Sequence, residues 1–359
     1  MPPWPTDVPS DAQLSGAEPS PVEASPVNLL RSARSDILIA GGLMLGGLGL
    51  HIGAMFPLYS GGGPSTAQSV LSMPDETAVY ICLEVGWALA ALLVLSRISV
   101  RGGVAVGAGL AAVEVGLLIT DVANGLTISN GSAPGVWLAV AGLCLGSAGV
   151  LFGAGSVPMG SPRLNPDDGT AVTRVTLTLL VAVVAVAAFW PSWDQFRLVG
   201  TSGGTETVTN GNVFSLAPGP MAGGVLTGLA IGLVVIVASF WAPPEIGGWL
   251  TTGVLIALSS QIISGYVQLH EPLREVTGTI NGVNLAQSSL TLTGYWTTDV
   301  AATIALAALA LWAGVAGRRL SSDSSAGSGA VPDRAVPDRA AAGPSTESDW
   351  PSAHHWPRT

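Results

Sequence analysis

Eight apolar stretches, each close to 20 residues long, recur along the chain and are separated by shorter polar segments. A helix needs about 20 predominantly apolar residues to cross the hydrocarbon core of a bilayer. It also satisfies its own backbone polar groups, which lipid cannot do. We therefore predict an all-α polytopic membrane protein with transmembrane helices at about 37–56, 78–96, 103–120, 136–157, 174–190, 222–241, 247–267 and 299–317.

The two chain ends differ from this region in composition. Residues 1–34 are rich in proline, serine and acidic residues, and residues 320–359 contain the direct repeat AVPDRAVPDR. Such segments bury too little apolar surface to fold. We expect a disordered tail at 1–34, an eight-helix domain at 35–319 and a second disordered tail at 320–359.

The placement of arginine predicts the orientation of the helices. All 13 basic residues are arginine, and 11 of them lie in the tails or in the connections that share a side with the tails. Only Arg197 and Arg274 lie on the other side. Because short cytoplasmic loops carry an excess of positive charge, both termini are expected in the cytosol and the protein in the inner (cytoplasmic) membrane.

With this orientation the outer connections are about 57–77, 121–135, 191–221 and 268–298. Three contain an Asn-Gly pair, at Asn130-Gly131, Asn210-Gly211 and Asn281-Gly282. Asn-Gly favours the tight turn of a β-hairpin, and the neighbouring stretches TETVT and NVFSL alternate as short strands do. The pattern predicts four helix–loop–helix hairpins with small β-hairpins in the outer loops. The alternative is that Asn-Gly simply favours loops.

Glycines recur at helical spacing on three of the predicted helices. They lie at Gly42, Gly46, Gly49 and Gly53, at Gly142, Gly146, Gly149 and Gly153, and at Gly224, Gly228 and Gly232. Small residues let helix backbones approach closely where lipid offers no hydrophobic drive for association. These stripes predict the helix-contacting faces of a closely packed bundle.

Four polar residues interrupt apolar stretches at a similar depth. His51 and Glu84 lie six residues, or about 9 Å at the usual helical rise, from the outer ends of their helices. Glu114 and Gln261 lie seven residues, or about 10 Å, from theirs. Ionisable residues inside a membrane are expensive and need partners. We therefore expect one polar layer in the outer leaflet.

This layer has two interpretations. In the first it forms a hydrated, outward-opening pocket, where Glu84 and Glu114 attract a cation or proton, His51 titrates and Gln261 orients a ligand. In the second it is a buried hydrogen-bond cluster that fixes helix pairing, or the glutamates reach up to the headgroups.

Composition and motifs narrow the possible functions. Charged residues make up only 10% of the chain, against about 25% in soluble domains. The net charge of −10 and the lack of a basic patch exclude nucleic-acid binding. The chain contains no HExxH, GxSxG or P-loop motif, and Cys82 and Cys144 have no metal-binding spacing.

We therefore expect no enzyme activity, no cofactor and no metal. The leading expectation is a non-catalytic accessory or assembly protein in the lipid bilayer, whose outer loops contact an envelope partner. The alternative is a small-solute or proton-linked transporter that uses His51, Glu84, Glu114 and Gln261.

Overall fold

The computed structural model describes residues 26–60, 68–128, 133–156, 168–200, 205–209, 212–216, 218–270, 279–280 and 283–327. Within these ranges eight helices are long and apolar enough to cross a membrane, which confirms the predicted helix number. They are α1 (Pro26–Ala54), α2 (Pro74–Leu95), α3 (Val100–Ile128), α4 (Pro134–Ser156), α5 (Gly169–Phe189), α6 (Pro218–Phe240), α7 (Pro244–His270) and α8 (Gly294–Gly327).

The sequence marks where several of these helices begin. α1, α2, α4, α6 and α7 each start at a proline, whose fixed φ suits the first helical turn and whose missing N–H is not needed there. α5 instead starts after Asp168, whose carboxylate accepts hydrogen bonds from the Thr170 hydroxyl and the Ala171 N–H. These donors hold the pKa of Asp168 below its ordinary value.

Residues 1–318 form one compact unit and residues 319–359 a second. α1 begins before residue 35, and α8 continues past residue 319, so helical structure extends beyond the predicted domain borders at both ends. Residues 1–25 and 328–359, which make up most of the two predicted tails, lie outside the described residues.

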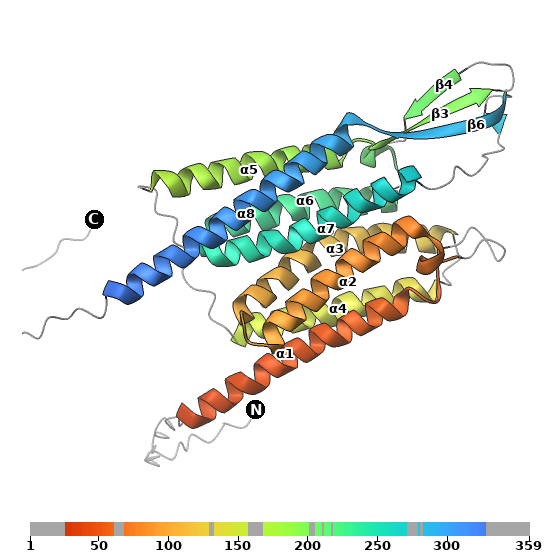
Figure 1. Ribbon diagram of the computed structural model, residues 1–359. Coiled ribbons are helices and arrows are strands. Elements are labelled where there is room, and N and C mark those ends of the chain that lie inside the picture. The colour runs from red at the N-terminus through yellow and green to blue at the C-terminus, as the bar shows by residue number, and fades with distance from the viewer. Residues whose placement is uncertain are drawn as a thin grey trace, which may run out of the picture. The chain divides into compact units, whose positions relative to one another are not determined.

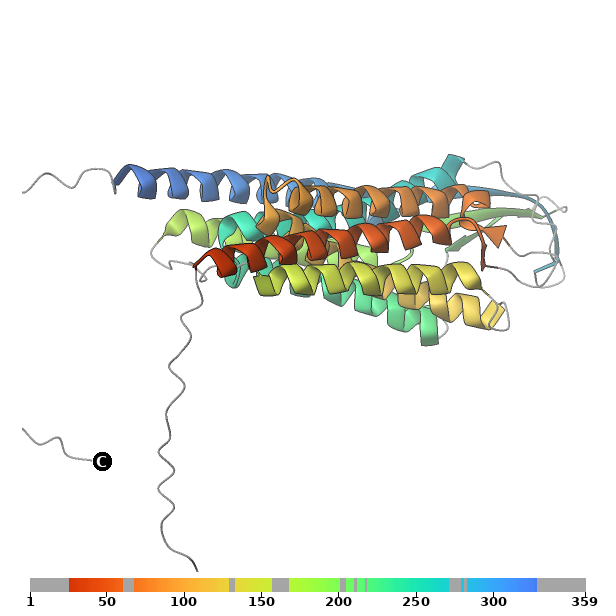
Figure 2. The ribbon, with the colours of Figure 1, turned by 90° about the horizontal axis from the view of Figure 1, so that it is seen from below.

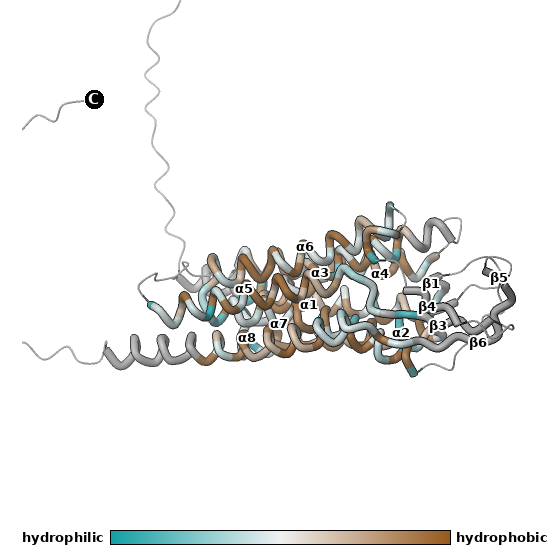
Figure 3. The backbone as a smooth tube through the Cα atoms, turned by 90° about the horizontal axis from the view of Figure 1, so that it is seen from above, coloured by the Kyte–Doolittle hydropathy of each residue, from teal (hydrophilic) through white to brown (hydrophobic). Residues whose placement is uncertain are grey.

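The eight helices of the first unit run side by side, and the strands continue beyond one end of them (Figure 1). We call this end, where α1 ends and α2 begins, the strand end. Apolar residues fill the middle of the helices, as the colours of Figure 3 show. α3 is the most enclosed helix, with 72% of its apolar window buried, against 22% for α5.

Helices that are distant in sequence make close backbone approaches. α3 packs against α6 where Gly116 meets the main chain of Thr227, and against α7 where Gly109 meets the main chain of Leu250. Both views of the ribbon place α1 beside α4 (Figures 1 and 2). Consecutive helices also pack together, including α1 with α2 and α3 with α4. The division into four helix–loop–helix hairpins therefore stays a prediction.

Glycine permits the approach of α1 to α4. A Cβ at Gly47 would lie 2.7 Å from the carbonyl oxygen of Gly142 and 2.7 Å from the backbone nitrogen of Gly146. One turn away, a Cβ at Gly149 would lie 2.7 Å from the carbonyl oxygen of Ala40. Real Cβ atoms do not approach backbone this closely, so only glycine fits at these positions.

The predicted glycine stripe of α4 lies at helix contacts, but on α1 only Gly46 of the predicted stripe does, where a Cβ would lie 2.9 Å from the Leu145 side chain. A Cβ at Gly42, Gly49 or Gly53 would meet nothing within 4 Å. The packed face of α1 instead carries the buried residues Ala40, Met44, His51 and Ala54, with Gly47 between them. Glycine spacing alone does not tell a packed face from an open one, because the larger residues on the other face supply the contact area.

The strands occur in connections at the strand end. β1 (Leu58–Ser60) pairs with β2 (Gln68–Ser69). β3 (Asp194–Gly200), β4 (Thr205–Thr209), β5 (Thr279–Ile280) and β6 (Val283–Leu292) are ordered β4-β3-β6-β5, with antiparallel pairing throughout. The pairing of β3 with β6 joins the connection after α5 to the one before α8. The sequence analysis treats these two connections as separate.

One predicted strand is wrong. NVFSL does not pair with TETVT, because β4, which is TETVT, pairs with β3. Val213–Ser215 instead form a 3-10 helix, and the Val213 N–H donates to the Trp190 carbonyl. The Asn-Gly pairs at 130, 210 and 281 all lie outside the described residues, so their turns stay predictions.

The α1–α4 contact yields a prediction on stability. Gly47→Ala should lower the free energy of unfolding by about 1–3 kcal/mol, because the added methyl group forces two backbones apart. Gly49→Ala is the matched control on the same helix, since the space there is open. It should leave stability unchanged or raise it by up to about 1 kcal/mol through helix propensity. Denaturant unfolding of the purified protein in detergent measures both, and equal effects would contradict the packing described here.

Candidate functional site

Three of the four predicted polar residues meet inside the bundle. His51 Nδ1 lies 3.2 Å from Glu114 Oε1 and 3.7 Å from Glu84 Oε1. The exposed fractions are 2% for His51, 9% for Glu84 and 3% for Glu114. Three different helices, α1, α2 and α3, thus contribute one ionisable side chain each to a single buried cluster.

The backbone of α4 shapes the space for the imidazole. The His51 ring packs directly on Gly142, where a Cβ would collide with it, and faces the main chain at Ala139. On the α2 side, the ring of Tyr80 lies 6.3 Å away between centroids. The small residues of α4 therefore direct Nδ1 towards the two carboxylates.

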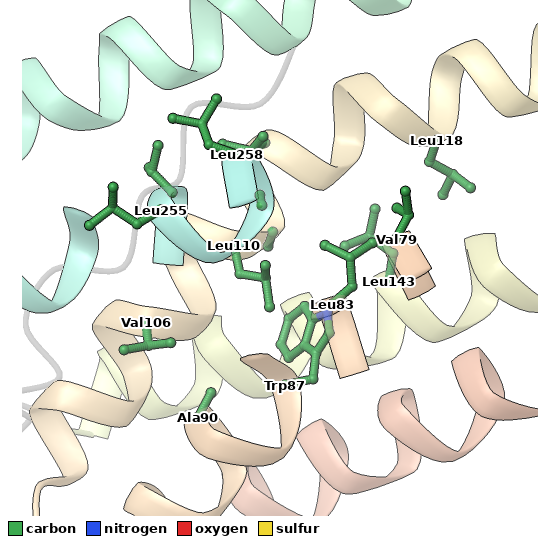
Figure 4. Close-up of a cluster of buried hydrophobic side chains, with 14 of the residues drawn as sticks. Val79, Leu83, Trp87, Ala90, Val106, Leu110, Leu118, Leu143, Leu255 and Leu258 are labelled. Carbon is green, nitrogen blue, oxygen red and sulfur yellow. The ribbon is translucent and has the colours of Figure 1, made fainter. Parts of the chain in front are cut away.

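Trp87 holds the carboxylate of Glu114. Its indole Nε1 donates to Glu114 Oε2 across 2.8 Å, and the ring is 1% exposed. Apolar side chains such as Leu83, Leu110 and Leu143 surround the indole (Figure 4). A Cβ at Gly146 would lie 2.9 Å from this ring, so α4 again leaves room for a site residue.

Glu84 is held less firmly than Glu114. Among the described residues neither of its carboxylate oxygens has a hydrogen-bond partner, although both are buried. The Nδ1 atom of His51 lies 3.7 Å from Glu84 Oε1, and neither ring nitrogen of His51 has a hydrogen-bond partner among the described residues. An unsatisfied buried polar group normally costs about 1–3 kcal/mol, so both Glu84 and His51 would gain from a proton or a ligand.

The chemistry of the cluster is that of proton exchange. Two carboxylates and one imidazole, all within 4 Å of His51 Nδ1, offer several places for a proton and titrate as one coupled unit. The described residues contain no group of three His, Cys, Asp or Glu side chains arranged to hold a metal ion. The cluster therefore has the composition of a proton-binding site and lacks the geometry of a metal centre.

A second group of acids lies between this cluster and the strand end. Glu76 interacts electrostatically with Asp121 and Asp75, and Asp121 also acts on Glu114. Glu76 precedes Glu84 by eight residues, or about 12 Å along α2. The half-buried acids Asp75, Glu76 and Asp121 thus lie between the strand end and the buried carboxylates.

Gln261 does not join the three ionisable residues. It is half-buried on α7, and among the described residues no hydrogen bond or ion pair connects it to His51, Glu84 or Glu114. The sequence predicts its depth in the membrane, but depth along a helix does not fix lateral position in a bundle.

Asp299 is a buried acid that does not stand out in the sequence. This residue is fully buried on α8, and neither carboxylate oxygen has a hydrogen-bond partner among the described residues. Thr303, one turn later, is also buried with an unpaired hydroxyl. Asp299 is the first residue of the predicted last helix, where an acid suits a helix end. α8 actually begins at Gly294, which places Asp299 inside the helix.

Comparisons with known proteins add no assignment: no protein-family model, no curated protein and no solved structure matches the chain.

The Trp87–Glu114 hydrogen bond can be tested by mutation. Trp87→Phe should lower the free energy of unfolding by about 2–4 kcal/mol, because it leaves a buried carboxylate unpaired and reduces core volume. Trp137→Phe is the control, since Trp137 is 51% exposed, and should have little effect. In a double-mutant cycle with Glu114→Leu, which removes the acceptor, the two losses should be less than additive. Full additivity would show that the two side chains are not coupled.

Proposed function

We propose that the protein is a proton-linked transporter of small solutes, with His51, Glu84 and Glu114 as its proton-binding site. One observation carries this proposal: two carboxylates and an imidazole from three helices meet at 3.2 and 3.7 Å and are almost fully buried. Burying one charged group at the bilayer centre costs at least about 2.5 kcal/mol on insertion scales, and a smaller cost applies at the outer-leaflet depth of this cluster. The helices already pack together through glycine contacts, so the bundle does not need buried ionisable groups to hold it together.

The acids at the strand end support this assignment. Asp75, Glu76 and Asp121 would attract protons or other cations from the adjacent solvent, and Glu84, the most exposed member of the cluster, would receive them. We propose that the strand end faces the outside of the cytoplasmic membrane and that both termini lie in the cytosol, as the positive-inside rule requires of the arginines.

The sequence alone favours an accessory protein over a transporter, whereas we propose the transporter first. Three of the four residues expected of a transporter come together, and Glu84 remains without a hydrogen bond of the kind that a purely structural cluster would supply. Gln261 has no part in the proposed site. Its expected role of orienting a ligand is not carried forward.

Proton binding can be measured without knowing the solute. We expect the infrared band of protonated carboxylic acids in the purified protein to change with pH, and to lose intensity in Glu84→Gln and Glu114→Gln. Glu245→Gln, at the exposed start of α7, is the matched control and should leave the part of the band that Glu84→Gln and Glu114→Gln remove. The amide replacements keep size and shape, so circular dichroism and gel filtration should stay unchanged.

Transport is then tested in proteoliposomes with an inward proton gradient and a panel of small solutes. Gradient-driven uptake should fall at least tenfold in Glu84→Gln and stay at the wild-type level in Glu245→Gln. If both glutamine variants bind protons and take up solutes as the wild type does, the cluster is a structural element and the proposal is wrong.

A second candidate function rests on the sheet. We propose as the alternative a non-catalytic accessory or assembly protein whose outer connections, with their small β-hairpins, contact an envelope protein. The pairing of β3 with β6 supports it, because two connections share one sheet whose terminal strands β4 and β5 offer edges for strand addition. Neither candidate function involves a catalytic step.

Cross-linking in cells followed by mass spectrometry distinguishes this alternative. An accessory protein should capture one fixed partner, and replacing either 191–221 or 268–298 with a short linker should abolish that capture. A transporter should retain gradient-driven uptake without any such partner. Failure to recover a fixed partner from wild-type cells would rule out the accessory function.

A further inference from the structure

An apolar cavity of about 1070 Å³ lies along α5 and α6, with a contribution from α3. Leu179, Val183 and Val186 of α5 line it from one side, and Leu226, Leu229 and Leu233 of α6 from the other. The cavity is open towards the surroundings of the bundle, since Val183 is 66% exposed and Leu233 is 61% exposed. In a membrane these side chains face lipid, so a lipid chain can enter sideways.

The length of this cavity matches one leaflet. The lining residues run from Leu179 to Trp190 on α5, which is 11 residues or about 16 Å, and from Leu226 to Ile236 on α6, or about 15 Å. Half of the hydrocarbon core of a bilayer is about 15 Å thick. The cavity therefore fits an extended acyl chain of one leaflet.

A second cavity, of about 890 Å³, adjoins the first at the strand end. Pro191, Asn212 and Tyr295 line both cavities and so mark the passage between them. The second cavity is more polar, and its lining includes the side chains of Gln195, Ser215, Thr293 and Thr298. None of the described residues that line it carries a charge. An anionic headgroup would require arginine or lysine partners, whereas amides and hydroxyls suit a neutral polyol.

We propose that these two cavities form one binding site for an amphiphile with an acyl-length chain and an uncharged, hydroxyl-bearing headgroup, the chemistry of a neutral glycolipid. The chain lies between α5 and α6, and the headgroup lies among Gln195, Asn212 and Ser215. The site shares α3 with the His51 cluster, but none of His51, Glu84 and Glu114 lines either cavity. It is therefore independent of the proton-linked function proposed above.

The test is retention of two lipids that differ only in their headgroups. The purified full-length protein is placed in phosphatidylcholine nanodiscs that contain either monoglucosyl diacylglycerol or phosphatidylglycerol with the same acyl chains. Native mass spectrometry then counts the lipids that remain bound after release. We expect the wild type to retain the glucosyl lipid at least fivefold more than phosphatidylglycerol.

Variants separate the chain from the headgroup. Leu229→Trp fills the apolar cavity and should reduce retention of the glucosyl lipid at least fivefold. Leu180→Trp is its control on a residue of similar exposure, 59% against 54%, that does not line the cavity, and it should retain the lipid as the wild type does. The surface double variant Gln195→Ala/Ser215→Ala should lose the preference for the glucosyl lipid while the protein stays folded.

Two results would overturn the proposal. Equal retention of both lipids by the wild type would show that acyl chains bind without headgroup recognition. Equal retention by Leu229→Trp and Leu180→Trp would show that the lipids lie elsewhere on the bundle. Either result leaves the infrared test of Glu84 and Glu114 unaffected, because neither carboxylate lines the two cavities.

Discussion

Lipid cannot form hydrogen bonds, so every backbone polar group that enters the hydrocarbon must find its partner within the protein. The arrangement of this chain follows from that constraint. Backbone groups are satisfied within eight helices, and the strands occur only in connections between them, at one end. The same constraint concentrates the charged side chains of α1, α2 and α3, because His51, Glu84 and Glu114 are each other's nearest available partners.

Close helix packing makes this concentration possible. Gly47 and Gly142 allow α1 to approach α4, and the imidazole of His51 fits against Gly142 one turn further along. Gly146 leaves room for Trp87, which in turn orients Glu114. The small residues of α4 thus act on the site without contributing a polar side chain to it. A helix with larger residues at these positions would separate the histidine from the acids.

Two kinds of binding chemistry occupy different parts of the bundle. α1, α2 and α3 carry the ionisable cluster, with further acids towards the strand end. α5 and α6 carry an apolar cavity that continues into a neutral polar one. The proposed proton site would therefore take protons from the aqueous phase, and the proposed amphiphile site would take its ligand from the membrane. The sheet that joins β3 to β6 connects the segment after α5 to the segment before α8, next to the polar cavity.

The sequence by itself determined the number of helices long and apolar enough to cross a membrane, because hydrophobic length is a local property. It also identified His51, Glu84 and Glu114 as candidates, since a charge within an apolar stretch is visible without any structure. The tertiary structure alone decided that these three meet while Gln261 stays apart, and that α1 packs through Gly47 rather than Gly49. It also decided that β3 pairs with β6 and that Asp299 is buried. These features depend on how each helix is rotated and which helix lies beside it, and packing between distant segments sets both.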